Sequence, residues 1–177
     1  MGDTLVECAV KRKTSVKNLA LLGLIIGLMV VVFAFFIFYF QNGIMFVIGI
    51  LLCVLISKIT SMCDEEYEYI FLNGDLEFAK IIGKKKRKEL LSVAMNEVEL
   101  VAPLSSDKLA PYEKGDSSRY QERDYSSAFP NHRNQMYAMI CRTENQAYRI
   151  IFEPNEKLIE AMWQLAPRVV VKKENVF

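Results

Sequence analysis

The chain has 177 residues, of which 52% are hydrophobic and 24% charged, with a net charge of +1 and a mean hydropathy of +0.15. A positive mean hydropathy excludes an ordinary water-soluble globule, and the charge balance excludes a disordered acidic or basic tail and a histone-like nucleic-acid binder. Beside its apolar part, the chain has room for one modest folded domain.

The N-terminal segment, residues 1–17, begins with a stretch of strand composition. Thr4 to Val10 reads TLVECAV, which is rich in β-branched and apolar residues. The apolar segment that follows this stretch is predicted, as argued below, to cross a membrane twice. The stretch is therefore expected on the same side of that membrane as the C-terminal domain. Whether it adds an edge strand to the sheet of that domain stays open at this point.

The most apolar part of the chain is residues 18–57, which contain no Asp, Glu, Lys or Arg. The run from Asn18 to Phe40 would measure about 35 Å as a helix, enough for a hydrocarbon core of about 30 Å. Gln41-Asn42-Gly43 breaks this run, and a second apolar stretch continues through Lys58 to about Met62. The pattern predicts a two-helix transmembrane hairpin over residues 18–62.

The charges at the two ends of the hairpin predict its orientation. Basic residues precede the first run and follow the second, whereas the turn carries no charge. The positive-inside rule then puts both termini in the cytoplasm, which makes the chain a multi-pass protein of the cytoplasmic membrane. A cleaved signal peptide fits poorly, because the apolar core is too long and a second apolar segment follows at once.

Gly23 and Gly27 form a GxxxG spacing within the first apolar run. Small residues at this spacing let two helix backbones approach closely. Two interpretations are open: the glycines pack against the second helix of the same hairpin, or they form the contact surface of a dimer.

The cysteines do not form a metal-binding pattern. Cys8, Cys53, Cys63 and Cys141 contain no CxxC pair, and His132 is the sole histidine. A structural zinc site needs four suitably spaced ligands, so no metal and no cofactor are expected. Cys8 and Cys141 are interpreted as small apolar residues in strands.

Strand signals dominate the first part of residues 63–177. Strands are predicted at Tyr67 to Leu72 and Leu76 to Ile82, joined by the hairpin signal Asn73-Gly74-Asp75. Gly83 and the basic run Lys84 to Lys88 predict a second turn. A third strand is predicted over 89–93. Residues 96–101 read as a short helix or another strand, and the alternation of Val98 and Leu100 with Glu97 and Glu99 favours the strand.

The second part begins with a long polar interruption over 103–135, which predicts a mobile insertion or a functional loop. Strands are predicted again at Met136 to Cys141 and Ala147 to Phe152, joined by a turn at 144–146. Asn155 then reads as the N-cap of an amphipathic helix that ends at Pro167.

The element pattern resembles bacterial pleckstrin-homology-like (PH-like) membrane proteins, in which two transmembrane helices precede a small PH-like domain. The matching stretches are YEYIFLNGDLEFAKIIGKKKRKELLSV, YAMICRTENQAYRIIF and EPNEKLIEAMWQLAPR, so the resemblance covers roughly 18–102 and 136–168. It implies a membrane α-helical hairpin followed by an α+β cytosolic domain. That domain, residues 63–177, would be a PH-like antiparallel β-barrel or sandwich with a C-terminal capping helix.

The sequence predicts that the chain is not an enzyme. Nucleophilic catalysis needs a base beside the nucleophile, and the sole histidine lies in the polar interruption, where a solvated side chain is expected. No phosphate-binding, dinucleotide-binding or metalloprotease motif is present.

The main candidate site is the basic run Lys84, Lys85, Lys86, Arg87 and Lys88. Such a cluster is attracted to anionic lipid headgroups by about 1 kcal/mol per charge near the surface. Nucleic acid is not expected as a partner, because residues 64–177 carry 17 basic and 19 acidic side chains.

A second candidate is the polar interruption, whose aromatic and arginine residues are of the kinds that dominate protein interfaces. Its candidate partner-binding residues are Tyr112, Tyr120, Arg123 and Tyr125. The predicted function is that of an interaction or scaffold protein that binds a protein partner, itself or anionic lipid. The alternative is an accessory subunit of a transporter or secretion complex that acts through its hairpin.

Overall fold

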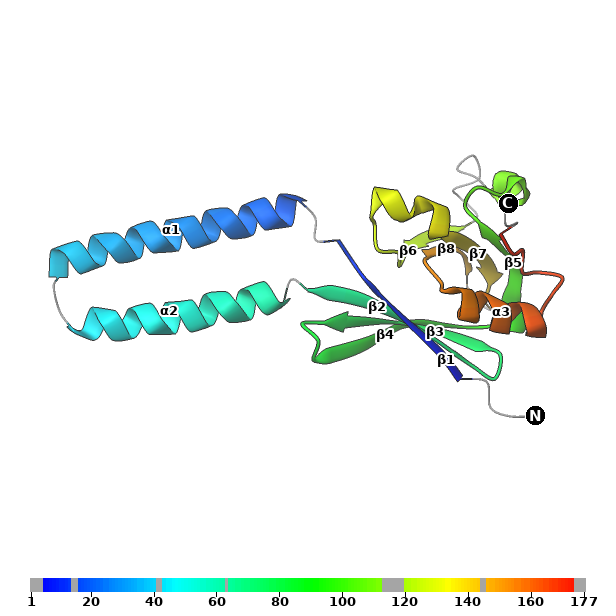
Figure 1. The fold of residues 1–177 in the computed structure, drawn as a ribbon, viewed down its shortest axis with the longest axis horizontal. Helices are drawn as coiled ribbons and strands as arrows, with labels where there is room; N and C mark the ends of the chain where they lie inside the picture. The colour runs from blue at the N-terminus through cyan, green and yellow to red at the C-terminus, as the bar shows by residue number, and fades with distance from the viewer. Residues whose placement is uncertain are drawn as a thin grey trace.

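The computed structural model describes residues 5–13, 16–40, 43–62, 64–112, 120–143 and 146–173. Two long helices extend away from a domain built of two four-stranded sheets (Figure 1). The predicted turns at residues 41–42 and 144–145, and Cys63, lie outside the described residues.

The first sheet joins the two sides of the helical hairpin. Its strands are β1 (Leu5–Lys11), β2 (Glu65–Leu72), β3 (Asp75–Ile82) and β4 (Lys86–Ala94), in that order and all antiparallel. The N-terminal stretch is therefore an edge strand paired with β2, which answers the question that its composition left open. Asn73 and Gly74, both with positive φ, form the predicted β2–β3 turn.

The second sheet has the order β5, β7, β8, β6, with bounds Val98–Pro103, Tyr137–Arg142, Ala147–Phe152 and Gln121–Asp124. The pair β6–β8 is parallel and the others are antiparallel. Short 3-10 helices η1 (Met95–Glu97), η2 (Asp107–Tyr112) and η4 (Pro130–Gln135) connect the strands. The interruption over 103–135 therefore contains a strand and two helical turns in its described part.

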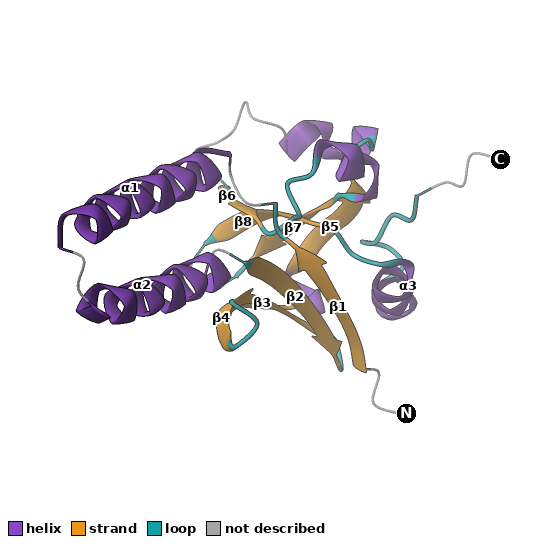
Figure 2. Ribbon diagram, turned by 60° about the vertical axis from the view of Figure 1, so that its left-hand side comes forward, coloured by secondary structure: helices purple, strands orange, loops and turns teal. Residues whose placement is uncertain are grey.

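The core of the domain lies between the two sheets, and α3 (Glu156–Leu165) packs at its side (Figure 2). The rings of Tyr69, Phe78 and Phe152 meet edge to face with centroids 5.6–5.7 Å apart. Leu158 and Met162 of α3 are fully buried against this cluster. Asn155 caps the helix as predicted, since its side chain accepts a hydrogen bond of 2.8 Å from the Leu158 N–H.

The hairpin consists of α1 (Val16–Phe40) and α2 (Gly43–Met62). It is inserted between two paired strands: Lys11 faces Glu66 in the β1–β2 register, and the Arg12 N–H donates to the Glu65 carbonyl at 2.9 Å. The hairpin therefore leaves the domain from the end of a β-ladder.

The prediction of a transmembrane hairpin is contradicted. A span needs about 20 consecutive apolar residues in one helix. Counted over the described residues alone, no helix is both long enough and apolar enough to cross a membrane. The expected fold class is corrected accordingly to an α+β fold with two sheets and a helical hairpin. The multi-pass location with both termini cytoplasmic is not supported.

Candidate functional site

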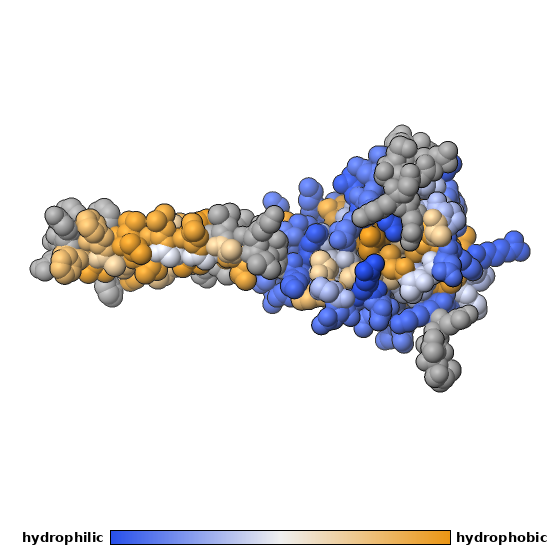
Figure 3. All heavy atoms as spheres, turned by 90° about the horizontal axis from the view of Figure 1, so that it is seen from above, coloured by the Kyte–Doolittle hydropathy of each residue, from blue (hydrophilic) through white to orange (hydrophobic). Residues whose placement is uncertain are grey.

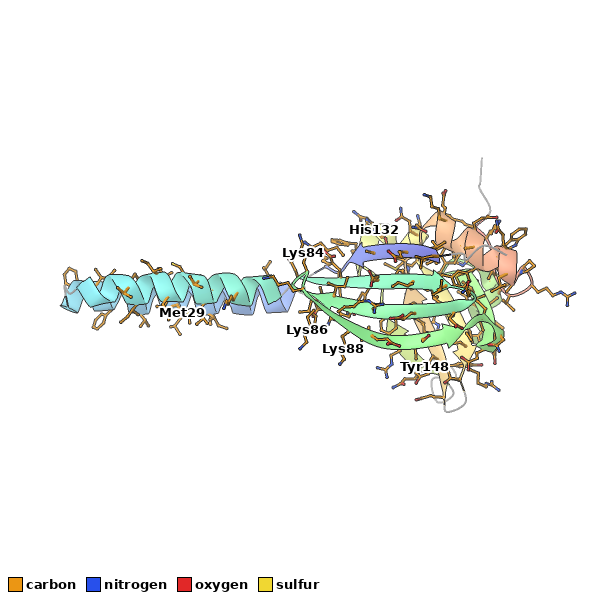
Figure 4. The ribbon with its side chains drawn as sticks, turned by 90° about the horizontal axis from the view of Figure 1, so that it is seen from below. Met29, Lys84, Lys86, Lys88, His132 and Tyr148 are labelled. Carbon is orange, nitrogen blue, oxygen red and sulfur yellow. The ribbon has the colours of Figure 1, made fainter. Side chains whose placement is uncertain are left out.

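The basic run begins in the turn between β3 and β4. Gly83 and Lys84 both have positive φ, and the Gly83 N–H donates to the Asp64 carbonyl at 2.8 Å. This bond ties the turn to the residue that precedes β2. The turn therefore lies at the end of the domain next to the helices, where Lys84, Lys86 and Lys88 are seen (Figure 4).

Arg87 differs from its four lysine neighbours because it is engaged within the first sheet. Its guanidinium contacts the carboxylates of Glu68 on β2 and Glu77 on β3, at 2.8 and 2.5 Å. Hydrogen bonds to these two carboxylates raise the pKa of Arg87. Arg87 thus links three adjacent strands on one face of the sheet, and its charge is already compensated.

The four lysines of the run remain available for an external anion. Lys84, Lys85, Lys86 and Lys88 are all exposed, and no carboxylate of the described residues lies within ion-pair distance of them. Strand alternation points Lys86 and Lys88 to the face opposite Arg87. Nearby Lys80, by contrast, pairs with Glu65 at 2.8 Å.

An apolar surface lies beside this basic turn. Among the described large apolar side chains that are exposed, all but Leu5, Leu72, Trp163 and Leu165 belong to α1 or α2. In the space-filling view this surface contrasts with the hydrophilic covering of the domain (Figure 3). A patch of this extent marks an interaction site. The two helices also line an open, largely apolar groove of about 600 Å³. Its lining residues are Phe33 and Ile37 of α1 and Gly49, Ile50, Cys53, Val54 and Lys58 of α2.

Gly23 and Gly27 make no contact with α2 within the part of the chain that the structure describes. A Cβ added to either one would meet no atom within 4 Å, whereas a Cβ on Gly49 would overlap the Phe33 ring. The glycine that permits close packing of α1 on α2 is therefore Gly49. Of the two interpretations of the GxxxG spacing, the contact with the second helix is not found.

The predicted partner residues of the interruption have separate locations. Tyr125 is a core residue, 9% exposed, with its ring 5.2 Å from that of Phe78. Tyr112 and Tyr120 stack edge to face at 5.8 Å over the outer side of the second sheet. Arg123 is exposed and hydrogen-bonded to Gln121. These four residues do not form one surface.

A polar cluster that the sequence did not indicate surrounds Glu153, which is 7% exposed. Its carboxylate lies 2.7 Å from His132 Nδ1 and accepts a 3.4 Å hydrogen bond from the Ser127 N–H. The histidine predicted to be solvated therefore lies within hydrogen-bond distance of a buried carboxyl group. The Ser127 hydroxyl lies 3.5 Å from the same Nδ1, which Glu153 already occupies, so the arrangement is not that of a nucleophile and its base.

The cysteines contribute no metal site among the described residues. Cys8 lies in β1 and Cys141 in β7, both in strands as predicted. Burial raises the pKa of the Cys8 thiol, and it raises the pKa of the Cys141 thiol to about 12. These thiols are therefore poor nucleophiles at neutral pH.

Comparison with known families agrees with this architecture. Residues 2–172 match the model of the family described as Bacterial PH-like domain (DUF6106). No curated protein and no solved structure matches the chain. The match covers the hairpin as well as both sheets and α3, so the chain belongs to this family of bacterial PH-like domains.

Proposed function

We propose that the chain is a non-enzymatic interaction protein whose PH-like domain contacts anionic lipid headgroups through Lys84, Lys85, Lys86 and Lys88. The observation that carries this proposal is the unequal pairing of the basic residues. Arg87 and Lys80 are engaged by carboxylates within the domain. The four lysines, two in the turn and two at the start of β4, have no such partner among the described residues.

Electrostatics gives this turn a substantial attraction to an anionic surface. Each cation near such a surface contributes about 1 kcal/mol, so four lysines contribute about 4 kcal/mol together. Because the domain carries nearly equal numbers of acidic and basic residues, the attraction depends on the turn and not on net charge. The exposed apolar side chains of the hairpin lie beside the end of the domain that carries the lysines. They would add apolar contact with the lipid to the electrostatic attraction of the lysines.

The test is binding of the full chain to phosphatidylcholine vesicles with and without phosphatidylglycerol. The variant replaces Lys84, Lys85, Lys86 and Lys88 by Gln. We expect it to lose the preference for anionic vesicles, with an affinity lower by on the order of a hundredfold or more. Added salt should weaken wild-type binding in the same direction.

A matched control removes four other exposed cations, Lys108, Lys157, Arg168 and Lys173, also by Gln. This control keeps the total charge of the first variant but leaves the turn intact. Equal losses in the two variants would show that only net charge matters. No anionic preference in the wild type would overturn the proposal.

A further inference from the structure

The groove between α1 and α2 has a cationic end and an apolar end. Among its described lining residues, only Lys58 carries a charge. Lys58 lies about one turn before α2 ends at the domain, whereas Ile37 lies about one turn before α1 ends at the tip of the hairpin. This tip is the end of the helices that is remote from the sheets (Figure 1). The groove therefore changes from cationic to apolar along the hairpin.

The sides of the groove are rows of side chains that follow the helices. Ile50, Val54 and Lys58 are spaced by four residues, and side chains at this spacing form a ridge along a helix. Phe33 and Ile37 have the same spacing on α1. The row on α2 rises about 12 Å from Ile50 to Lys58. The groove is therefore elongated, which is the shape that a linear molecule fills.

Small side chains on α2 leave space for such a molecule. Gly49 lies against the Phe33 ring, and Cys53 follows one turn later. The groove has a volume of about 600 Å³, within the range of about 300–1,000 Å³ that is typical of a site for one small molecule. Its size therefore suits a single slender ligand better than a folded protein.

The charge of Lys58 has no compensating carboxylate in the hairpin. Residues 8–63 contain neither Asp nor Glu. No ion pair among the described residues involves Lys58, which is exposed. A cation at one end of an apolar groove is complementary to a molecule that has one anionic head and an apolar tail.

We infer that the groove binds one long-chain fatty acid, with its carboxylate at Lys58 and its acyl chain directed toward Ile37 at the hairpin tip. The single cation matches the single charge of a carboxylate, and the single groove matches one acyl chain. Ile50 and Val54, which are 56% and 54% exposed, would be covered by the chain, and this burial favours binding. The site is separate from the contact proposed for the basic turn.

Alkylation of Cys53 in the full chain tests this site, because Cys53 lines the groove. Its thiol is left as the sole one by replacing Cys8, Cys63 and Cys141 with Ala. Its reaction with a maleimide should slow about tenfold when free hexadecanoate is at about ten times its Kd. The matched control moves the thiol to Leu51→Cys with Cys53→Ala. Leu51 is 70% exposed on α2 but does not line the groove, so its reaction rate should stay nearly unchanged.

The charge of the ligand tests the role of Lys58. Hexadecan-1-ol has a chain of the same length without the negative charge, so it should protect Cys53 with an affinity lower by about fivefold. Lys58→Gln should remove this difference between acid and alcohol. Lys108→Gln removes an exposed cation of the domain and should preserve the difference.

A variant that fills the groove gives an independent test. Val54 and Leu55 are neighbours on α2 with similar exposure, 54% and 46%, but only Val54 lines the groove. Val54→Trp should weaken hexadecanoate binding on the order of tenfold, because the indole takes the place of the chain. Leu55→Trp should leave it nearly unchanged, and circular dichroism checks that both variants keep their helices. The four-lysine Gln variant should bind hexadecanoate as the wild type does, so this site and the contact of the basic turn can fail separately.

Four results would overturn the inference. No slowing at Cys53 would mean that the groove takes no acyl chain. Equal slowing at Cys53 and at Leu51→Cys would mean that the amphiphile coats the hairpin without a site. Equal affinities of the acid and the alcohol for the wild type would remove the role of Lys58. Undiminished binding to Val54→Trp would place the chain outside the groove.

Discussion

Glu153 shows how a single buried charge is stabilised in this fold. Its carboxylate lies 2.7 Å from His132 Nδ1 and accepts a hydrogen bond of 3.4 Å from the Ser127 N–H. Removing a partner of a buried charged group costs about 1–3 kcal/mol. We therefore expect His132→Ala to lower the free energy of unfolding by about 1–2 kcal/mol, measured by urea denaturation. Arg133→Ala, at an exposed neighbour, should change it by less than about 0.5 kcal/mol; an equal loss in both variants would contradict the assignment.

Cys141 gives a prediction about pH at the same scale. Burial raises its thiol pKa from 9.0 to about 12, so above pH 9 the unfolded chain releases a proton that the folded chain retains. Stability is therefore intact below about pH 9 and falls as the pH rises toward 12. By about pH 10 the wild type should lose about 1.4 kcal/mol more than Cys141→Ala does, as urea denaturation at pH 8 and pH 10 would measure. Parallel pH profiles of the two proteins would contradict this account.

At the scale of elements, Arg87 acts as a tie across three strands. Its contacts with Glu68 and Glu77 are partly exposed, and such pairs contribute about 0.5–1 kcal/mol. Arg87→Ala should lower the unfolding free energy by about that amount, whereas Lys86→Ala should leave it nearly unchanged. Thermal denaturation of the two variants measures whether Arg87 stabilises the sheet and Lys86 does not. A larger loss for Lys86→Ala would refute the distinction between them.

The contact of α1 with α2 depends on the absence of a side chain at Gly49. A Cβ there would overlap the Phe33 ring, so Gly49→Ala should separate the helices despite the higher helix propensity of Ala. We expect a lower helical melting temperature by circular dichroism. Phe33→Ala alone removes packing, but combined with Gly49→Ala it should remove the clash. The double variant should therefore be more stable than the sum of the single losses predicts, and simple additivity would contradict the contact.

The elements with local signals were predictable, and those that depend on distant partners were not. Asn73-Gly74 marks the β2–β3 turn because both residues accept positive φ, and Asn155 marks the start of α3. By contrast, β4 begins at Lys86 rather than at 89, because an edge strand with one solvated side tolerates lysines that otherwise suggest a turn. β6 was missed because its pairing with β8, 27 residues away in register, is set by tertiary structure.

The sequence predicts which residues make up the candidate site. It does not predict that Arg87 is paired within the sheet while its lysine neighbours are not. The basic run is recognisable as five consecutive cations, yet only the sheet register shows that Arg87 reaches Glu68 and Glu77. In the same way, Tyr125 has the composition of an interface residue but is buried against Phe78. No local signal marks Glu153 as the partner of His132, since the two are 21 residues apart.

For the whole molecule, the connection between hairpin and domain predicts that the domain folds without the helices. The hairpin is inserted between β1 and β2, where Lys11 faces Glu66 and Arg12 bonds Glu65. The two ends of the insertion are thus adjacent in space, and among the described residues no member of the core of the two sheets comes from α1 or α2. Replacing residues 14–63 with a short Asn-Gly turn would close β1 and β2 as an ordinary antiparallel hairpin.

The shortened chain should unfold cooperatively in urea and give a dispersed amide NMR spectrum, because its buried core is unchanged. Its basic turn should still favour anionic vesicles over neutral ones, because Lys84, Lys85, Lys86 and Lys88 are retained. A matched deletion that removes β1 together with the hairpin tests the limit of this independence. That deletion uncovers β2 and the side of α3 that contacts β1, so it should lose cooperative unfolding. If the chain without residues 14–63 were itself unfolded, the helices would be part of the folding unit and the hairpin could not be regarded as an insertion.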